Sequence, residues 1–131
     1  MTYAPRILIV DDEPMVRRLF ERVLSEDGYL VTTAATGRHG LLLLRDTAFD
    51  LIILDMSLPD VDGVELMGEL RVEFPELKVL AVSGFMGRHL RDATTAAGAT
   101  VTLGKPAAPG ELRRAVYRSL DGSFSWQAGK S

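Results

Sequence analysis

Five short apolar segments recur along this chain of 131 residues, at intervals of 22 to 27 residues. Each segment is short enough to be a strand buried on both faces, and each interval has room for one helix and two turns. Parallel strands need a long crossover between them, so this spacing predicts repeated strand–helix units around a parallel sheet. The segments begin near Arg6, Tyr29, Leu51, Lys78 and Thr100.

The intervals between these segments carry helix signals. From Pro14 to Asp27 the apolar residues fall on one helical stripe, with Pro14 suited to a first turn and Gly28 to the end. Thr36 is expected to cap a second helix that runs through Leu41–Leu44. Further helices are predicted at about residues 64–73, 88–97 and 109–120, and the Ala- and Thr-rich helix at 88–97 should be marginal. The residues of the first helix expected to face the core are Val16, Leu19, Phe20, Val23 and Leu24.

Composition limits what such a domain does. The chain has no cysteine, which excludes disulfides, thiolate metal sites and cysteine nucleophiles. Its 15 Lys and Arg against 18 Asp and Glu give a net charge of −3, which disfavours general binding to nucleic acid or anionic membranes. The longest apolar runs have four residues, whereas a membrane span needs about 20. The acidic residues directly after the first run argue against a secretory signal.

Polar side chains follow four of the five predicted strands. Asp11 and Asp12 come after the first, Asp55 after the third, Ser83 after the fourth, and Lys105 one residue beyond the fifth. In open α/β sheets, ligands bind outside the carboxyl ends of the strands. The sequence therefore predicts that three carboxylates, a hydroxyl and an ammonium group meet at one edge of the sheet.

This set of groups suits phosphoryl transfer. Carboxylates that lie close together raise one another's pKa unless cations are present, and Lys105 supplies one. Mg²⁺ suits a shallow site of carboxylates and water, and Asp11 and Asp12 are its candidate ligands. Asp55 stands alone at its strand end, so it is the candidate nucleophile toward a phosphoryl group. The metal and Lys105 would stabilise the oxygens of that group in the transition state.

Four motifs surround these residues, in the order Val10-Asp11-Asp12-Glu13, Leu54-Asp55-Met56-Ser57-Leu58-Pro59-Asp60-Val61-Asp62-Gly63, Val82-Ser83-Gly84 and Gly104-Lys105-Pro106. With these motifs in this order, the sequence resembles a response-regulator receiver domain of two-component signalling over about residues 5–120. The resemblance implies a flavodoxin-like, doubly wound α/β fold with a five-stranded parallel sheet of order 2-1-3-4-5 and five helices. It predicts a receiver domain at residues 1–120 and a short flexible tail at 121–131.

The resemblance implies a role for each acidic residue. Asp55 would accept a phosphoryl group from a phosphohistidine on a histidine kinase or a histidine phosphotransfer protein. Asp12 and Asp55 would bind Mg²⁺ directly, with the Ser57 carbonyl as a further ligand and Asp11 acting partly through water. The domain would catalyse its own phosphorylation and slow dephosphorylation, and it is not expected to act as an enzyme on other substrates.

The switch residues match the family only in part. Ser83 and Lys105 would contact the phosphoryl oxygens, and the Lys105–Pro106 bond is typically cis in such domains. An aromatic residue usually stands three positions before the lysine, but here the position holds Thr102. A second departure is Ala107, where an aromatic often follows Lys-Pro. We therefore expect intact phosphorylation chemistry with an altered or weak coupling to the output.

The expected partners are proteins. In receivers, the first helix and the loop near Pro106 usually dock the kinase, so Met15, Arg18 and Arg22 are candidate contacts, although they also suit a merely solvated helix face. The downstream protein target is unknown, and no direct contact with nucleic acid and no membrane insertion are expected. A bacterial, cytoplasmic protein that is a monomer or weak dimer is the expectation.

Three alternative interpretations stay open. Few residues follow Leu120 and the chain begins at Met1, which favours a stand-alone receiver over the receiver fragment of a hybrid histidine kinase. Thr102 makes a pseudo-receiver conceivable, a module that binds partners without phosphorylation. A Mg²⁺-dependent phosphohydrolase is disfavoured, because such enzymes commonly need an acid two residues after the nucleophile and Ser57 occupies that position.

Overall fold

A computed structural model of the chain describes residues 3–84 and 88–120, with only the backbone described at residues 88–91. The predicted alternation of strands and helices is confirmed, and the predicted strand starts and the bounds predicted for four of the helices lie within one residue of those observed. The strands are β1 (Arg6–Val10), β2 (Leu30–Ala34), β3 (Leu51–Asp55), β4 (Lys78–Ser83) and β5 (Val101–Gly104). The helices are α1 (Pro14–Glu26), α2 (Gly37–Asp46), α3 (Gly63–Glu73), α4 (Arg88–Ala96) and α5 (Pro109–Ser119).

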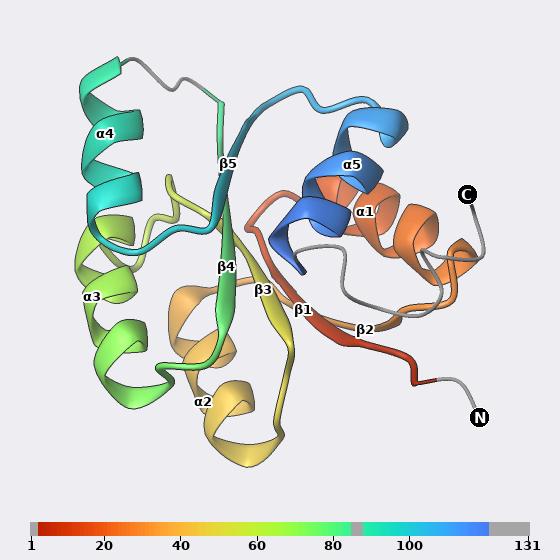
Figure 1. The fold of residues 1–131 in the computed structure, drawn as a ribbon, viewed down its shortest axis with the longest axis horizontal. Coiled ribbons are helices and arrows are strands. Elements are labelled where there is room, and N and C mark those ends of the chain that lie inside the picture. Colours follow the sequence, from red (N-terminus) through yellow and green to blue (C-terminus); the bar gives the residue numbers. More distant parts are fainter. Residues whose placement is uncertain (1–2, 85–87, 121–131) are drawn as a thin grey trace.

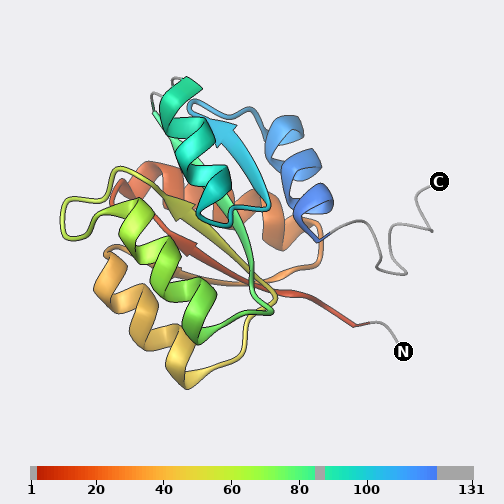
Figure 2. The same ribbon diagram turned by 60° about the vertical axis from the view of Figure 1, so that its left-hand side comes forward.

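The strands form one sheet in the order β2-β1-β3-β4-β5, and every neighbouring pair is parallel. The predicted fold class and strand order are confirmed. Helices cover both faces: α1 and α5 lie on one side of the sheet, and α2, α3 and α4 lie on the other (Figures 1 and 2). Because all strands point the same way, their carboxyl ends share one edge, where the candidate site residues lie.

Two separate apolar cores follow from the alternation of side chains along the strands. Ile7 and Ile9 of β1 point toward α1 and α5 and join one core, whereas Leu8 and Val10 point toward α2 and α3 and join the other. The central strand β3 is buried along its whole length. Its Leu-Ile-Ile-Leu sequence has no alternation, as expected for a strand covered on both faces.

Short polar residues and prolines set the helix ends. The Thr36 side chain accepts a hydrogen bond from the His39 amide at 3.0 Å, which confirms the predicted cap of α2. The Asp62 carboxylate accepts bonds from the Val64 and Glu65 amides at 2.9 and 3.1 Å and so caps α3. Helix α3 ends two residues before Pro75, because proline disfavours helical backbone in the residue that precedes it.

One expectation about α1 is wrong. Phe20, Val23 and Leu24 are buried as predicted and Val16 is partly buried, but Leu19 is 40% exposed. Leu19 lies at the edge of the apolar stripe, beside a surface cleft near Pro106 rather than under another helix. Helical spacing alone does not distinguish the middle of a stripe from its margin.

The α4 region has two unusual features. Thr94 is fully buried, and its hydroxyl has no hydrogen-bond partner among the described residues. After the helix, Gly98 adopts a φ of +118° and packs on the side chain of Arg71, whose guanidinium donates to the Leu77 carbonyl oxygen. The predicted tail at 121–131 lies outside the described residues. Within the described ranges, no helix is long and apolar enough to cross a membrane.

Candidate functional site

The ends of the strands place the candidate residues by continuing the sheet's own hydrogen bonding. The Asp11 amide donates to the Ala34 carbonyl at 3.1 Å, and the Lys105 amide donates to the Ser83 carbonyl at 2.7 Å. The backbone hydrogen bonding between neighbouring strands therefore extends one residue beyond the strand end and holds each of these residues in place. Asp55 is itself the last residue of β3, in register with Val82 of β4.

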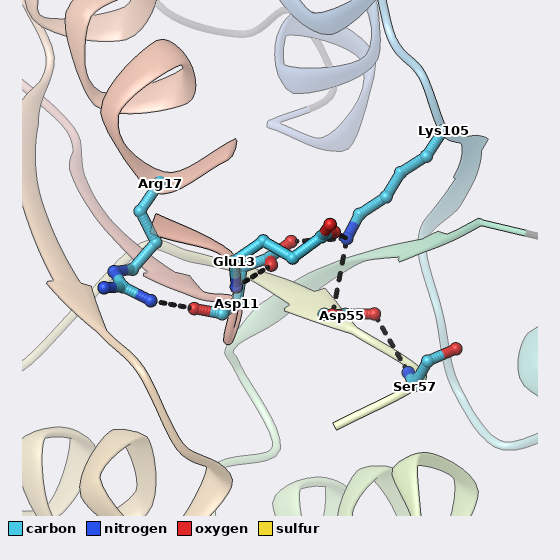
Figure 3. Close-up of polar contacts among 6 residues, drawn as sticks. All are labelled: Asp11, Glu13, Arg17, Asp55, Ser57 and Lys105. Carbon is cyan, nitrogen blue, oxygen red and sulfur yellow. Dashed lines mark hydrogen bonds and ion pairs between the residues drawn. The ribbon is translucent and has the colours of Figure 1, made fainter. Parts of the chain in front are cut away.

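The Lys105 ammonium joins the acidic side chains of two strand ends (Figure 3). Its Nζ lies 2.8 Å from Asp11 Oδ2, 2.8 Å from Glu13 Oε1 and 3.4 Å from Asp55 Oδ2. Burial disfavours the charged ammonium, but the hydrogen bonds to Asp11 and Glu13 outweigh that effect and raise the pKa of Lys105 well above its usual range. Lys105 is thus a permanent cation at this edge.

Asp55 is almost fully buried, with 3% of the residue exposed. Its Oδ1 accepts a hydrogen bond from the Ser57 amide at 2.9 Å, which leaves Oδ2 facing Lys105 (Figure 3). Burial raises the pKa of Asp55 and the charge of Asp11 adds to this, while the Ser57 amide and Lys105 act in the opposite direction. The carboxylate is therefore ordered and incompletely neutralised.

Asp11 and Asp12 complete the acidic cluster. Asp11 is buried, and its Oδ1 accepts from the Glu13 amide at 2.9 Å, whereas Asp12 is exposed. One carboxylate oxygen from each of Asp11, Asp12 and Asp55 lies within 4.8 Å of the others. Clustered carboxylate oxygens with an open, solvent-facing side are the donor set that Mg²⁺ prefers, so these residues fit that ion.

Ser83 and Thr102 lie at the two neighbouring strands. Ser83 is buried at the end of β4 in register with Gly104, which places it beside the chain that leads to Lys105. Thr102 is partly buried and in register with Ala81. Val101 and Leu103 pack on the core formed with α1 and α5, so the alternation along β5 turns Thr102 toward the face that α4 covers. The Lys105–Pro106 peptide is cis, as expected.

The family model of the response regulator receiver domain matches residues 7–117. The chain is a response regulator receiver domain. Receiver domains of two-component signalling accept phosphoryl groups from histidine kinases or phosphotransfer proteins, and they generally bind Mg²⁺ at an acidic pocket.

Proteins of known sequence or structure resemble this chain over most of its length. Sporulation initiation phosphotransferase F of Bacillus subtilis is 30% identical, over 88% of this chain and 93% of that protein. The alginate biosynthesis transcriptional regulatory protein AlgB of Pseudomonas aeruginosa is 34% identical over 88% of this chain, which spans only 26% of AlgB. The structure of a CheY-like receiver domain protein from Methanospirillum hungatei JF-1 superimposes with a TM-score of 0.86 at 30% identity, covering 98% of this chain and all of that one.

Three polar residues whose contacts organise the chain after β1 and β3 had no role in the sequence interpretation. Glu13 stood in the first motif, but nothing in the sequence indicated that its side chain reaches Lys105. The Arg17 guanidinium, in the first turn of α1, donates to the carbonyl of Asp11, six residues earlier in the sequence, at 2.7 Å. Asp60 accepts from the Gly37 and Arg38 amides at 3.0 and 3.1 Å, joining the loop after β3 to the start of α2.

The residues expected to dock a kinase are at the surface of the receiver domain. Met15 is 79% exposed, Arg18 and Pro106 are exposed, and Arg22 lies 3.8 Å from Glu26 on the same helix. Between α1 and the loop after β5, a cleft of about 420 Å³ opens beside the acidic cluster. The residues that line this cleft are Glu13, Val16, Leu19, Phe20, Gly84, Lys105, Pro106 and Ala107.

Proposed function

We propose that this receiver domain accepts a phosphoryl group on Asp55 from the phosphohistidine of a histidine kinase or a histidine phosphotransfer protein. The observation that carries the proposal is that the Lys105 ammonium lies within 3.4 Å of Asp55 Oδ2 while it also binds Asp11. A reactive carboxylate, a fixed cation and a candidate metal-ligand pair thus share one edge of the sheet. These groups favour phosphoryl transfer to a carboxylate.

The chain's own groups divide the work of the transfer. Because the Ser57 amide holds Oδ1, Asp55 is oriented with Oδ2 toward Lys105. An Asp55 oxygen forms the new bond to phosphorus as the bond from phosphorus to the imidazole nitrogen breaks, and the electron pair stays with the imidazole. Lys105 stabilises the negative charge on the phosphoryl oxygens, and Ser83 is placed to contact them from β4.

Asp12 and Asp55 would hold Mg²⁺ directly, with the Ser57 carbonyl as a further ligand and Asp11 partly through water. When bound, the ion would neutralise part of the carboxylate charge and that of the transferring group. The fit of three carboxylates within 4.8 Å supports this assignment.

We further propose that residues 1–120 form the receiver and residues 121–131 a tail, and that the protein acts in the cytoplasm as a monomer or weak dimer. The chain spans 93% of sporulation initiation phosphotransferase F but only 26% of AlgB, so receivers of both organisations resemble it. The signal would leave through protein contacts. Met15, Arg18, Arg22 and Pro106 would dock the phosphoryl donor, in keeping with their exposure.

Intact-mass spectrometry tests the phosphoacceptor. The protein is incubated with Mg²⁺ and acetyl phosphate, and we expect one added phosphoryl group that hydroxylamine removes. Asp55→Asn should gain none, whereas the matched control Asp92→Asn, which alters an exposed carboxylate on α4, should gain one. Absence of any gain in the wild-type chain would refute the proposal and favour a pseudo-receiver. Repeated turnover of an aryl phosphate would identify a phosphohydrolase instead.

One observation favours the pseudo-receiver as a second candidate. Thr102 is a small, partly buried residue next to Ala81, at the position where an aromatic usually couples the site to the surface. A phosphorylated chain whose α4–β5 surface shows no change in amide chemical shifts would present the same surface to partners with or without phosphorylation, as a pseudo-receiver does. Shifts confined to β4, α4 and β5 on phosphorylation would instead support a switch that works without the aromatic.

A further inference from the structure

Glu13 is the third carboxylate on Lys105, and the phosphoacceptor chemistry does not require it. Its Oε1 lies 2.8 Å from Lys105 Nζ, closer than the 3.4 Å that separates Nζ from Asp55 Oδ2. The Glu13 side chain is 59% exposed, whereas that of Asp55 is 3% exposed. Figure 3 shows Glu13 reaching over Asp11 to meet the end of the Lys105 side chain.

The side chain of Glu13 has no other structural task among the described contacts. Glu13 is the N-cap residue of α1, but its side chain makes no capping hydrogen bond, and the helix starts instead with Pro14. The carboxylate lines the cleft between α1 and the loop after β5, together with Lys105. It therefore places a negative charge on the exposed side of the same ammonium that faces Asp55.

We propose that Glu13 is a positioning residue that holds Lys105 at the rim and makes the site select against small dianionic phosphoryl donors. This inference rests on the proposed phosphoacceptor function of Asp55 and deepens it. The ammonium that should stabilise the incoming phosphoryl oxygens is bound to a carboxylate that lies in their path. An anionic donor must displace Glu13 from Lys105 and approach against its charge.

The geometry sets the size of the effect. The Glu13 carboxylate and Asp55 Oδ2 lie 2.8 and 3.4 Å from the same Lys105 nitrogen, so they are within roughly 6 Å of each other. At that separation in water, one negative charge slows the approach of a dianion roughly three-fold at physiological ionic strength and roughly seven-fold at about 0.01 M salt. For a monoanion the factors are the square roots of these, roughly 1.7-fold and 2.6-fold.

Phosphorylation rates with two donors of different charge test the inference. Acetyl phosphate is a dianion near neutral pH and releases acetate with the electron pair of the broken bond. Phosphoramidate carries less net negative charge and releases ammonia, whose nitrogen is already protonated in the zwitterion. The second-order rate constant of Asp55 labelling, with Mg²⁺ present, is measured by intact mass for wild type, Glu13→Gln, Glu13→Asp and the exposed α1 control Glu21→Gln.

We expect Glu13→Gln to accelerate labelling by acetyl phosphate about three-fold, and by more at low salt. At physiological ionic strength, phosphoramidate labelling should rise less than two-fold, so the ratio of the two rate constants changes. Glu13→Asp should restore the wild-type ratio because it restores the charge, and Glu21→Gln should leave both rates unchanged. A merely structural role for Glu13 would alter both donors equally and independently of salt.

Different failures have different meanings. Equal rates for wild type and Glu13→Gln, or equal changes with both donors, would overturn the role of Glu13 and leave Asp55 as the phosphoacceptor. A slower reaction of Glu13→Gln would also overturn it, because Glu13 would then assist Lys105 in catalysis. No labelling of any variant by either donor would overturn the phosphoacceptor function, and the inference about Glu13 with it.

Discussion

Replacing Asp55 by Asn should make the metal-free protein more stable at neutral pH. Burial raises the pKa of Asp55, and the neighbouring charge of Asp11 adds to it. A carboxyl whose pKa is higher in the folded than in the unfolded state destabilises the fold once it is ionised. The cost therefore appears as the pH rises from the unfolded pKa of about 3.9 through the folded pKa, and it is fully present above both.

The magnitude follows from three interactions of the Asp55 carboxylate. At an effective dielectric constant of about 20, repulsion from Asp11, which has an oxygen within 4.8 Å of an Asp55 oxygen, costs at least ~3 kcal/mol, with a smaller cost from the exposed Asp12. Attraction to Lys105 across 3.4 Å returns ~5 kcal/mol. Desolvation of a buried carboxylate costs several kcal/mol more. Asn keeps the acceptor for the Ser57 amide, so we expect a net stabilisation of about 2 kcal/mol.

Urea unfolding in EDTA at pH 7 measures this difference. The gain should vanish near pH 3, where wild-type Asp55 is protonated in both the folded and the unfolded protein. The control Asp92→Asn, at an exposed residue of α4, should change the free energy of unfolding by less than about 0.5 kcal/mol. Mg²⁺ at about 100 times its Kd should stabilise wild type by ~2.7 kcal/mol and Asp55→Asn by less. A metal-free Asp55→Asn protein that is less stable than wild type at pH 7 would refute the electrostatic reasoning.

Other substitutions test other parts of the structure. Thr94→Val removes a buried hydroxyl that has no partner among the described residues, and it should raise the free energy of unfolding by about 1 kcal/mol in urea; a loss would show that the hydroxyl is bonded. Gly98→Ala should cost at least ~2 kcal/mol, because φ is +118° and the new methyl group would overlap the Arg71 side chain. Gly28→Ala, at φ +93° with open space around it, should cost only about 1 kcal/mol, and equal costs would contradict the packing at Gly98. Lys105→Ala should still accept a phosphoryl group. In EDTA at pH 7 it should lower the free energy of unfolding by about 3 kcal/mol, because it leaves two buried carboxylates unpaired. An unchanged urea midpoint would contradict that pairing.

The sequence was sufficient to predict the sheet and the meeting point of its strand ends. Period and spacing specify which segments are strands, and the parallel arrangement then brings Asp11, Asp55 and Lys105 to one edge whatever the details of packing. The structure agrees, since Lys105 contacts both carboxylates directly. These positions could be predicted because the backbone ladder, and not a side-chain conformation, determines them.

The contacts that the sequence did not predict depend on side-chain conformations. Glu13 has several rotatable bonds and an exposed position. It contacts Lys105 because the fold brings that positive charge within reach, and the spacing of residues in the sequence does not indicate this. Leu19 matched the helical stripe, but its exposure depends on how wide a gap Ala107 leaves opposite α1. Asp60 caps α2 from a loop 23 residues away in sequence, a distance at which no local pattern operates.

The ladder bonds made by Asp11, Met56 and Lys105 beyond the strand ends have a consequence for how such a domain can diverge. The backbone of Asp11, Asp55 and Lys105 is held by the sheet's own pairing, so its position does not depend on which side chains the outer helices present to solvent. A descendant of this protein can therefore exchange exposed side chains of α1 or α4 for those that suit a new partner and keep the acidic cluster in place. Divergence at the sheet edge itself has no such freedom, because moving one of these hydrogen-bonded residues displaces the neighbouring strand as well.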